Sequence, residues 1–153
     1  MTEMNELTTI LRQAGVVGAG GAGFPTYAKL STGIDLLLAN GAECEPLLNK
    51  DQILMANHPQ VVLDGMKEVM KAIGAKKGIV AVKSKNSDSI LALTKALSSS
   101  ALPIEVFPLP DIYPAGDEGV LIYEVLKKVV SPGALPRTIG ALVDNIETLV
   151  NVA

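Results

Sequence analysis

Residues 17–46 read VGAGGAGFPTYAKLSTGIDLLLANGAECEP, and the rest of the chain is organised around this stretch. It opens with a glycine loop, residues 18–25, which Lys29, a short apolar run and the turn NGAECEP at residues 40–46 follow. Glycines allow backbone N–H groups to approach an anion closely, and a nearby lysine adds a full positive charge. The stretch therefore predicts a site for a phosphorylated, partly polar cofactor, a substrate phosphate or a nucleotide.

The glycine loop alone does not identify the ligand. Gly18, Gly20 and Gly23 match the dinucleotide pattern G-x-G-x-x-G, which requires a strand before the loop and a helix after it. Residues 5–14 instead read as a helix that ends at Gly15. This context argues against an ordinary Rossmann site, and a P-loop is excluded because no Gly-Lys-Ser/Thr is present.

The acidic turn carries Glu43 and Glu45 on either side of Cys44. Residues two apart in an extended segment point the same way, so both carboxylates are predicted to line one wall of a site. The alternative is a solvated acidic turn. Cys44 has no evident catalytic base, and His58, the one histidine, lacks the partners of a metal site, so no metal is predicted.

Strands alternating with amphipathic helices predict an α/β fold, a three-layer α/β/α sandwich with a mainly parallel sheet. It is Rossmann-like, but the glycine-rich loop follows a helix. Ligands of such sheets bind beyond the carboxyl ends of the strands. The expected strands are 34–39, 78–82, 104–107 and 139–143, and the expected helices are 5–14, 25–30, 50–56, 59–73, 87–97, 117–128 and one from Ile146.

Composition restricts the class of protein. With 153 residues, 48% of them apolar, the chain is predicted to form a single domain with one core. A net charge of −3 and 3% aromatic residues give no support for nucleic-acid binding. No apolar run reaches the roughly 18 residues that would span a membrane, and the acidic segment 1–6 is unlike a secretory signal. The expected location is the cytoplasm.

The cysteine count and the last residues add two expectations. With Cys44 alone, the chain can form no internal disulfide and no cysteine-ligated iron–sulfur cluster. Residues 147–153 read as a helix that is still apolar at its end, without a glycine or proline stop. Residues 1–153 are therefore interpreted as one domain excised from a longer polypeptide.

Two later segments complete the pattern. Residues 113–118 (YPAGDE) place Tyr113, Gly116, Asp117 and Glu118 at the entry to a helix, and residues 144–149 (DNIETL) place Asn145 and Thr148 at another. Acidic and amide side chains are favoured at helix starts, so simple capping is one interpretation. A helix start is also suited to bind phosphate, so capping and ligand binding are compatible.

Together, GVVGAGGAGFPTYAKL, NGAECEP, the YPAGDE segment and the DNIETL segment resemble the flavin-binding domain of the C subunit of the Rnf electron-transport complex. They resemble, more distantly, the NADH-binding flavoprotein subunit of respiratory complex I. The resemblance covers nearly the whole chain. It implies FMN as a cofactor, NADH as a hydride donor, and iron–sulfur clusters (4Fe-4S) in regions outside this chain. It also implies partner subunits in a membrane-associated complex, at the inner face of the membrane.

The resemblance also implies roles for individual residues. The residues expected to contact the phosphate and the ribityl chain are those of the glycine loop (Gly18, Gly20, Gly21 and Gly23), Lys29, and the turn at Asn145 and Thr148. Those expected to contact the flavin ring and the approaching nicotinamide are Asn40, Glu43 and Glu118, together with Tyr113, Gly116 and Asp117 in the second loop. Glu43 is assigned to the flavin and Glu45 to the incoming nicotinamide nucleotide, and these two glutamates are the predicted catalytic residues.

Two positions depart from the complex I pattern, which has an acidic residue at position 42 and an arginine at position 19. This chain has alanine at both, so the Rnf-like branch fits better. Related proteins serve other acceptors, as in cobalamin or proline reductase systems. A flavin-free docking domain of an electron-transfer complex is a second hypothesis. A phosphosugar or nucleotide enzyme is a weaker third one, because no general acid–base pair is evident outside the acidic turn.

Overall fold

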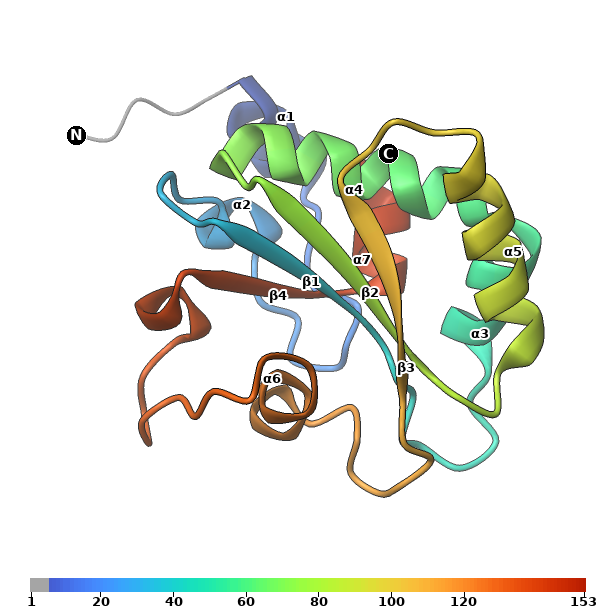
Figure 1. The fold of residues 1–153 in the computed structure, drawn as a ribbon. Coiled ribbons are helices and arrows are strands. Elements are labelled where there is room, and N and C mark those ends of the chain that lie inside the picture. Colours follow the sequence, from blue (N-terminus) through green and yellow to red (C-terminus); the bar gives the residue numbers. More distant parts are fainter. Residues whose placement is uncertain (1–5) are drawn as a thin grey trace.

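A parallel sheet forms the centre of the domain (Figure 1). The computed structural model describes residues 6–153, so the expected helix start at residue 5 and the first five residues of the acidic segment 1–6 lie outside the described residues. The strands are β1 (Leu36–Gly41), β2 (Lys77–Lys83), β3 (Ile104–Leu109) and β4 (Ala141–Asn145). They lie in the order β3-β2-β1-β4, and every pairing is parallel. The predicted parallel α/β architecture is confirmed.

Helices cover both faces of this sheet. One face carries α3 (Lys50–Asn57), α4 (Pro59–Ile73), α5 (Ser87–Ser98) and α7 (Ile146–Val152), whereas α6 (Glu118–Leu126) covers the other (Figure 1). The remaining helices are α1 (Glu6–Ala14) and the single turn α2 (Thr26–Lys29), with a 3₁₀ turn, η1 (Pro136–Ile139), before β4. The arrangement is the expected three-layer sandwich.

Strand residues alternate between two cores. On β1, Leu37 and Ala39 pack with the four-helix face, and Leu38 packs with α6. On β2, Val80 belongs to the first core and Ile79 to the second. Because both faces are covered, these strands are apolar at nearly every position, as is typical of buried parallel strands.

The helix α4 has the bounds that the sequence predicts. Pro59 occupies its first turn, and Gly74, with a left-handed φ of 80°, ends it. Its buried face repeats at spacings of three and four residues and includes Val62, Met66 and Val69. Periodicity and both end signals agree here, which explains the accurate prediction.

Two strands begin later than expected and end later, so their predicted bounds are wrong. β1 continues through Asn40 and Gly41, which the sequence places in a loop, and β4 continues to Asn145. Asn40 pairs with Asn145 across the ladder, and the long-range pairing outweighs the turn preference of Asn-Gly. At the other end, the N–H groups of Asp35 and Leu36 both donate to the carbonyl of Gly140.

Smaller differences concern the other elements. The predicted helix 117–128 begins at Glu118, because Asp117 is its cap, and it ends at Leu126, because Lys127 is left-handed with a φ of 53°. β3 extends through Pro108, which is tolerated because β3 is an edge strand. The expected helix 25–30 begins at Thr26, since Pro25 precedes it as the cap residue. In residues 6–153, no helix has the length and apolar character that crossing a membrane would require.

Candidate functional site

The segments that the sequence singles out meet beyond the carboxyl ends of β1 and β4. Two adjoining cavities lie there, of about 340 Å³ beside Lys29 and about 460 Å³ beside Glu43. We call them the Lys29 cavity and the Glu43 cavity, and together the groove. Both cavities are bordered by a shared set of residues, namely Gly20, Asn40, Gly116, Asp117 and Asn145. The groove is within the size range of cofactor sites.

The glycine loop is held closed at its base and open at its tip. Gly18 N–H donates to the Phe24 carbonyl at 2.8 Å, next to a bridge between Val17 and Pro25. Gly21 has a φ of 105°, a conformation that strongly favours glycine. Within residues 6–153, the N–H groups of residues 20–23 have no acceptor in the protein. Consecutive free N–H groups of this kind can bind an anion.

The loop is attached to the rest of the domain at Ala19. Its N–H donates to Thr148 Oγ1 at 2.9 Å, and its carbonyl accepts from Lys50 Nζ at 2.9 Å. Lys50 also forms an ion pair with Glu147 on α7. Gly20 packs against Asn145, where an added Cβ would lie 3.4 Å from the Asn145 Cβ. The loop thus rests on the starts of α3 and α7.

The Lys29 side chain is paired with a buried carboxylate at the end of β4. Its Nζ lies 3.3 Å from the Val143 carbonyl and 3.5 Å from Asp144 Oδ1. Asp144 is 2% exposed, and its Oδ2 has no hydrogen-bond partner. Burial raises the pKa of Asp144, and Lys29 opposes that rise. Burial likewise raises the pKa of Glu118, again opposed by Lys29.

The segment at residues 113–118 is fastened to the end of β1. Asn40 Nδ2 donates to the Gly116 carbonyl at 2.8 Å, and Gly116 N–H donates to Cys44 Sγ at 3.1 Å. A Cβ on Gly116 would lie 2.0 Å from the Ala42 carbonyl oxygen. Only glycine allows this approach, which sets the width of the groove. Tyr113 is 81% exposed at its rim.

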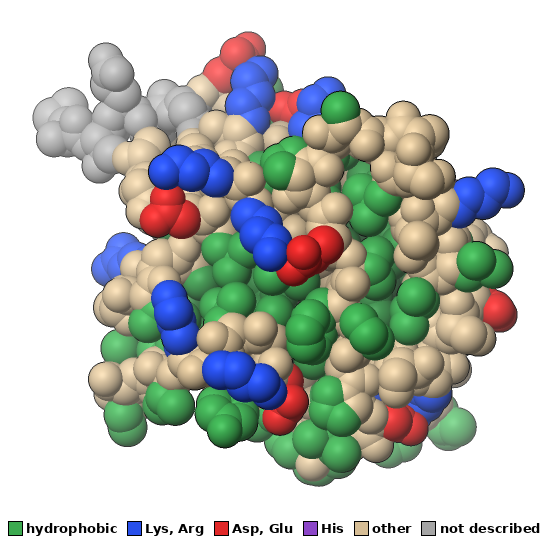
Figure 2. All heavy atoms as spheres, in the orientation of Figure 1, with side chains coloured by type: hydrophobic (Ala, Val, Ile, Leu, Met, Phe, Trp, Pro, Cys, Tyr) green, Lys and Arg blue, Asp and Glu red, His purple; other side chains and the backbone are tan. Residues whose placement is uncertain are grey.

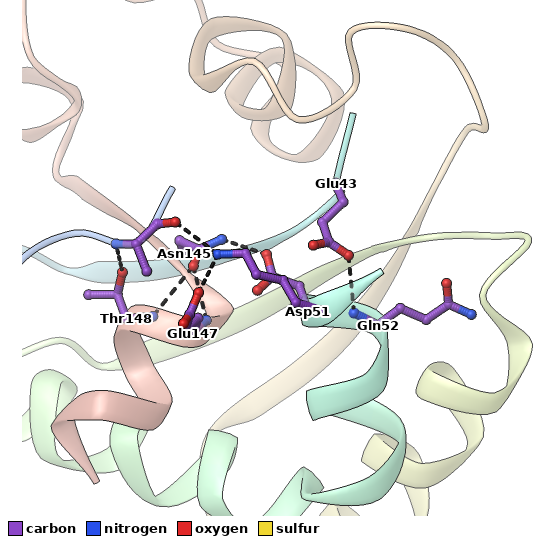
Figure 3. A network of polar contacts seen from close by, with 8 residues as sticks. Glu43, Asp51, Gln52, Asn145, Glu147 and Thr148 are labelled. Carbon is purple, nitrogen blue, oxygen red and sulfur yellow. Dashed lines mark hydrogen bonds and ion pairs between the residues drawn. The ribbon is translucent and has the colours of Figure 1, made fainter. Parts of the chain in front are cut away.

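Two carboxylates meet on the far side of the groove (Figure 3). Glu43 Oε2 accepts from the Gln52 N–H at 3.4 Å, and Glu43 Oε1 is buried without a partner. Asp51 is 2% exposed; its Oδ2 accepts from Asn145 Nδ2 at 2.6 Å, and its Oδ1 has no partner. Burial raises the pKa of Asp51 to about 6, and the nearby Glu43 adds to the rise, whereas Asn145 and Lys50 oppose it.

The structure brings most of the predicted site residues together. The Lys29 cavity or the Glu43 cavity is bordered by Gly18, Gly20, Gly21, Lys29, Asn40, Glu43, Glu45, Tyr113, Gly116, Asp117, Glu118, Asn145 and Thr148. Gly23 borders neither, and its φ of 59° gives it a place in the turn. Glu45 is exposed at the mouth, while Glu43 is half-buried. The two glutamates therefore differ in their surroundings.

The capping interpretation also holds. The Asp117 side chain accepts from the N–H groups of Gly119 and Val120, and the Asn145 side chain accepts from those of Glu147 and Thr148. Both residues border the groove as well. Capping fixes their position, so it does not compete with a role in the site.

Sequence reasoning missed Lys50 and Asp51 at the start of α3. Their position could have indicated a role in the site, because they follow the acidic turn directly and begin a helix at the same edge of the sheet. At the start of α7 the cap residue is Asn145, and Asp144 is instead the buried partner of Lys29. In the described part of the chain, no group of three or more His, Cys, Asp or Glu side chains is placed to hold a metal ion.

Curated relatives match nearly the whole chain. The cobalamin reductase PduS of Citrobacter freundii is 46% identical over 142 residues, which are 93% of this chain and 31% of that protein. The C subunit of the Na⁺-translocating ferredoxin:NAD⁺ oxidoreductase complex of Acetobacterium woodii is 37% identical over 155 residues, 99% of this chain and 35% of that protein. The chain therefore spans about a third of the length of these relatives.

A solved structure has the same fold. One chain of an NAD⁺-reducing [NiFe]-hydrogenase in the H₂-reduced state is similar to this domain, with a TM-score of 0.81 and 28% sequence identity. The match covers 95% of this chain and 29% of that one. The family model described as the Nuo51 FMN-binding domain matches residues 11–153, which include the glycine loop, the acidic turn and both later segments. This chain belongs to the Nuo51 FMN-binding domain family.

Proposed function

We propose that residues 1–153 form a domain that binds FMN in the groove. The observation that carries the proposal is the groove itself, where free backbone N–H groups of the glycine loop and unpaired buried carboxylate oxygens converge. Buried polar atoms without partners are rare in proteins, and a polar ligand would supply those partners.

Each part of the groove suits a part of FMN. The N–H groups of residues 20–23 are suited to the phosphate, and Lys29 lies near enough to the Lys29 cavity to add charge. Asn40 and Asn145 border both cavities where these adjoin, so they lie between the proposed positions of the ribityl chain and the ring. Bound FMN would accept a hydride and release electrons singly, while the protein supplies binding and orientation.

The two catalytic glutamates take different positions. Glu43, half-buried with a free Oε1, faces the ring, and Glu45, exposed at the mouth, faces an arriving NADH. Glu118, whose pKa burial raises, lies on the opposite wall with Asp117.

The activity of the full-length protein is the second part of the proposal. It would take hydride from NADH and pass electrons to 4Fe-4S clusters held outside this chain, as a component like the C subunit of the Rnf complex. Its partners would be NAD(H) and the other subunits of a membrane-associated complex, on the cytoplasmic face. The support is the 37% identity to the C subunit from Acetobacterium woodii.

A second candidate function differs in the electron acceptor. Two relatives, from Citrobacter freundii and Salmonella typhimurium, are cobalamin reductases, at 46% and 43% identity. The acceptor would then be a cobalamin. NADH-dependent reduction of cobalamin by the full-length protein, compared with reduction of ferredoxin, decides between the two.

The test of the cofactor is a titration of FMN into the purified domain, followed by quenching of flavin fluorescence. We expect Lys29→Ala and Glu43→Ala each to weaken binding by about tenfold to a hundredfold, the worth of a lost charge-assisted hydrogen bond. Lys95→Ala, an exposed lysine on α5, is the matched control and should bind like the wild type. No binding by either the domain or the full-length protein would refute the flavin proposal and favour a docking domain.

A further inference from the structure

Asp51, in the first turn of α3, is connected to the glycine loop through Asn145 and Thr148 at the start of α7 (Figure 3). Asp51 Oδ2 accepts from Asn145 Nδ2 at 2.6 Å, slightly shorter than the usual N–H···O distance. A carboxylate acceptor makes such a bond stronger than a neutral one. Since Asp51 is 2% exposed, water cannot replace this contact.

Asn145 connects Asp51 to the first turn of α7, because its amide bonds to both. Its Oδ1 accepts from the N–H groups of Glu147 at 3.0 Å and Thr148 at 3.4 Å, which sets the first turn of α7. The Nδ2 bond to Asp51 decides which way the Asn145 amide faces, because only that orientation leaves Oδ1 toward the helix. Thr148 Oγ1 then accepts from Ala19 N–H in the glycine loop at 2.9 Å.

Lys50, the neighbour of Asp51, also holds the glycine loop, by a direct contact with Ala19. Lys50 Nζ donates to the Ala19 carbonyl at 2.9 Å and pairs with Glu147. Both backbone groups of Ala19 are therefore held from the junction of α3 and α7. Gly20, the next residue, packs on the Asn145 side chain. A shift of Asn145 would move the part of the loop that borders both cavities.

We propose that Asp51 is a positioning residue of the flavin site, which acts through Asn145 and Thr148 to hold the glycine loop in its binding conformation. The inference rests on the proposed function for its ligand only. The contacts that carry it belong to the chain itself.

The cost of Asp51 argues against a purely structural role. Its Oδ1 is buried without a partner, and it faces the charge of Glu43, so its ionised form is disfavoured. The Asn145 amide donates to the carboxylate and Lys50 attracts it, and both only partly oppose the effect of burial. A group needed only for the stability of the fold would be better served by an uncharged side chain. Destabilising groups of this kind are typical of functional sites.

The first measurement is FMN affinity in three variants. Asp51→Ala leaves the Asn145 amide unpaired and should weaken FMN binding by about tenfold or more. Asp51→Asn keeps an oxygen that can accept from Asn145 and should restore affinity to within about threefold of the wild type. Asp88→Ala is the matched control, because Asp88 occupies the same place in the first turn of α5 but is exposed. It should have no effect.

The second measurement needs no flavin. Amide hydrogen exchange at Ala19, read by NMR in the ligand-free domain, reports the bond to Thr148. Asp51→Ala should speed this exchange by about tenfold while α4 amides stay protected, and Asp51→Asn should restore the slow rate. If the wild type binds no FMN, the proposed function fails, and the exchange rates alone decide the positioning role.

Two outcomes would overturn the inference. One is unchanged exchange at Ala19 in Asp51→Ala. The other is an Asp51→Asn variant that loses FMN affinity as fully as Asp51→Ala, which would mean that the charge and not the positioning matters. General unfolding of Asp51→Ala, seen as lost protection in α4, would also contradict the inference, because Asp51 would then be needed for the fold as a whole.

Discussion

The two faces of the sheet are covered very differently (Figure 1). On one face, four helices enclose large side chains such as Leu63, Met66 and Ile73, none of which has exposed area. The other face has α6 alone, and its core includes small residues, Ala42, Ala81 and Ala115. The thick face provides stability. The thin face leaves space beside the sheet, and the segment at residues 113–118 closes one side of the groove there.

The surface shows the same contrast. Large hydrophobic side chains are exposed in residues 112–135, which include α6; they are Ile112, Tyr113, Tyr123, Val129 and Leu135. Figure 2 shows hydrophobic side chains on the surface in the lower part of the view, where α6 lies in Figure 1. A face with so little covering can change locally without loss of the fold. The same change should therefore have different consequences on the two faces.

The largest effect is expected from Gly65→Ala on the thick face. A Cβ there would lie 1.9 Å from the Leu149 carbonyl oxygen, so α4 and α7 would have to separate. We expect a loss of about 3 kcal/mol or more in the free energy of unfolding, measured by urea denaturation. Asp64→Ala, at the exposed neighbouring position, should change it by less than about 0.5 kcal/mol. A cost below about 1 kcal/mol for Gly65→Ala would contradict tight packing between these helices.

The equivalent change on the thin face is Gly116→Ala. Its Cβ would lie 2.0 Å from the Ala42 carbonyl oxygen, nearly the same clash. Because the segment at residues 113–118 can shift outward, we expect only about 2 kcal/mol of lost stability. FMN affinity should fall by about a hundredfold, since the groove wall moves.

Gly119→Ala provides the control for this comparison. It lies in the first turn of α6, where the added Cβ meets only Asp117 Oδ1 at 3.3 Å. FMN affinity should stay near that of the wild type. If Gly116→Ala destabilised the domain as much as Gly65→Ala, the distinction between the faces would be wrong.

Helix bounds could be predicted best on the thick face of the sheet. α4 could be placed to the residue because an apolar stripe, Pro59 and Gly74 all agree. The ends of β1 and β4 could not, because Asn40 and Asn145 have the local preferences of turn residues but pair in the ladder. Local propensity does not include the energy of a strand that lies far away in the sequence.

The site was predictable where glycines and acids form motifs, and unpredictable where a role depends on distant partners. Gly116 and Asn145 stand in recognisable segments. Asp51 does not, since its partner Asn145 lies 94 positions away. Lys29 is an intermediate case: its place after the loop predicts a ligand contact, but its ion pair with Asp144, 115 positions away, could not be foreseen. Its contact with a ligand stays a prediction.

Asp51 itself gives a prediction about stability against pH. Its pKa in the folded domain is raised from 3.8 to about 6, so the folded state holds a proton that the unfolded state has released between these values. The contribution of Asp51 to the free energy of unfolding therefore falls as pH rises from about 4 to about 6, and it stays low above about pH 6. Asp51→Asn, with no carboxyl to titrate, should be more stable than the wild type at about pH 8 by about 2 to 3 kcal/mol, because each unit of the rise in pKa corresponds to about 1.4 kcal/mol.

Urea denaturation of both proteins across this pH range checks the sign. The difference between the two should vanish near pH 4 and grow to its plateau above about pH 6. A wild type that gained stability relative to Asp51→Asn as pH rose would mean that Asp51 is stabilised as an anion. Its contacts with Lys50 and Asn145 would then outweigh burial.

The smallest effect is expected at the amino ends of the strands, away from the groove. Lys77 on β2 and Glu105 on β3 form an ion pair at 2.7 Å, and each side chain is about half exposed, at 51% and 49%. Exposed pairs contribute less than about 1 kcal/mol, because water and salt screen the attraction. A double-mutant cycle of Lys77→Ala and Glu105→Ala should give a coupling below about 0.5 kcal/mol that disappears in about 1 M salt.

FMN affinity should not change in either of these two variants. The ion pair lies at the opposite end of the sheet from Asn40 and Asn145, with the strands between. A measurable change in affinity would show that the amino ends of the strands are coupled to the groove. The contrast would then have to be drawn between the two ends of the sheet as well as between its two faces, because a disturbance at one end would reach the site through the strands themselves.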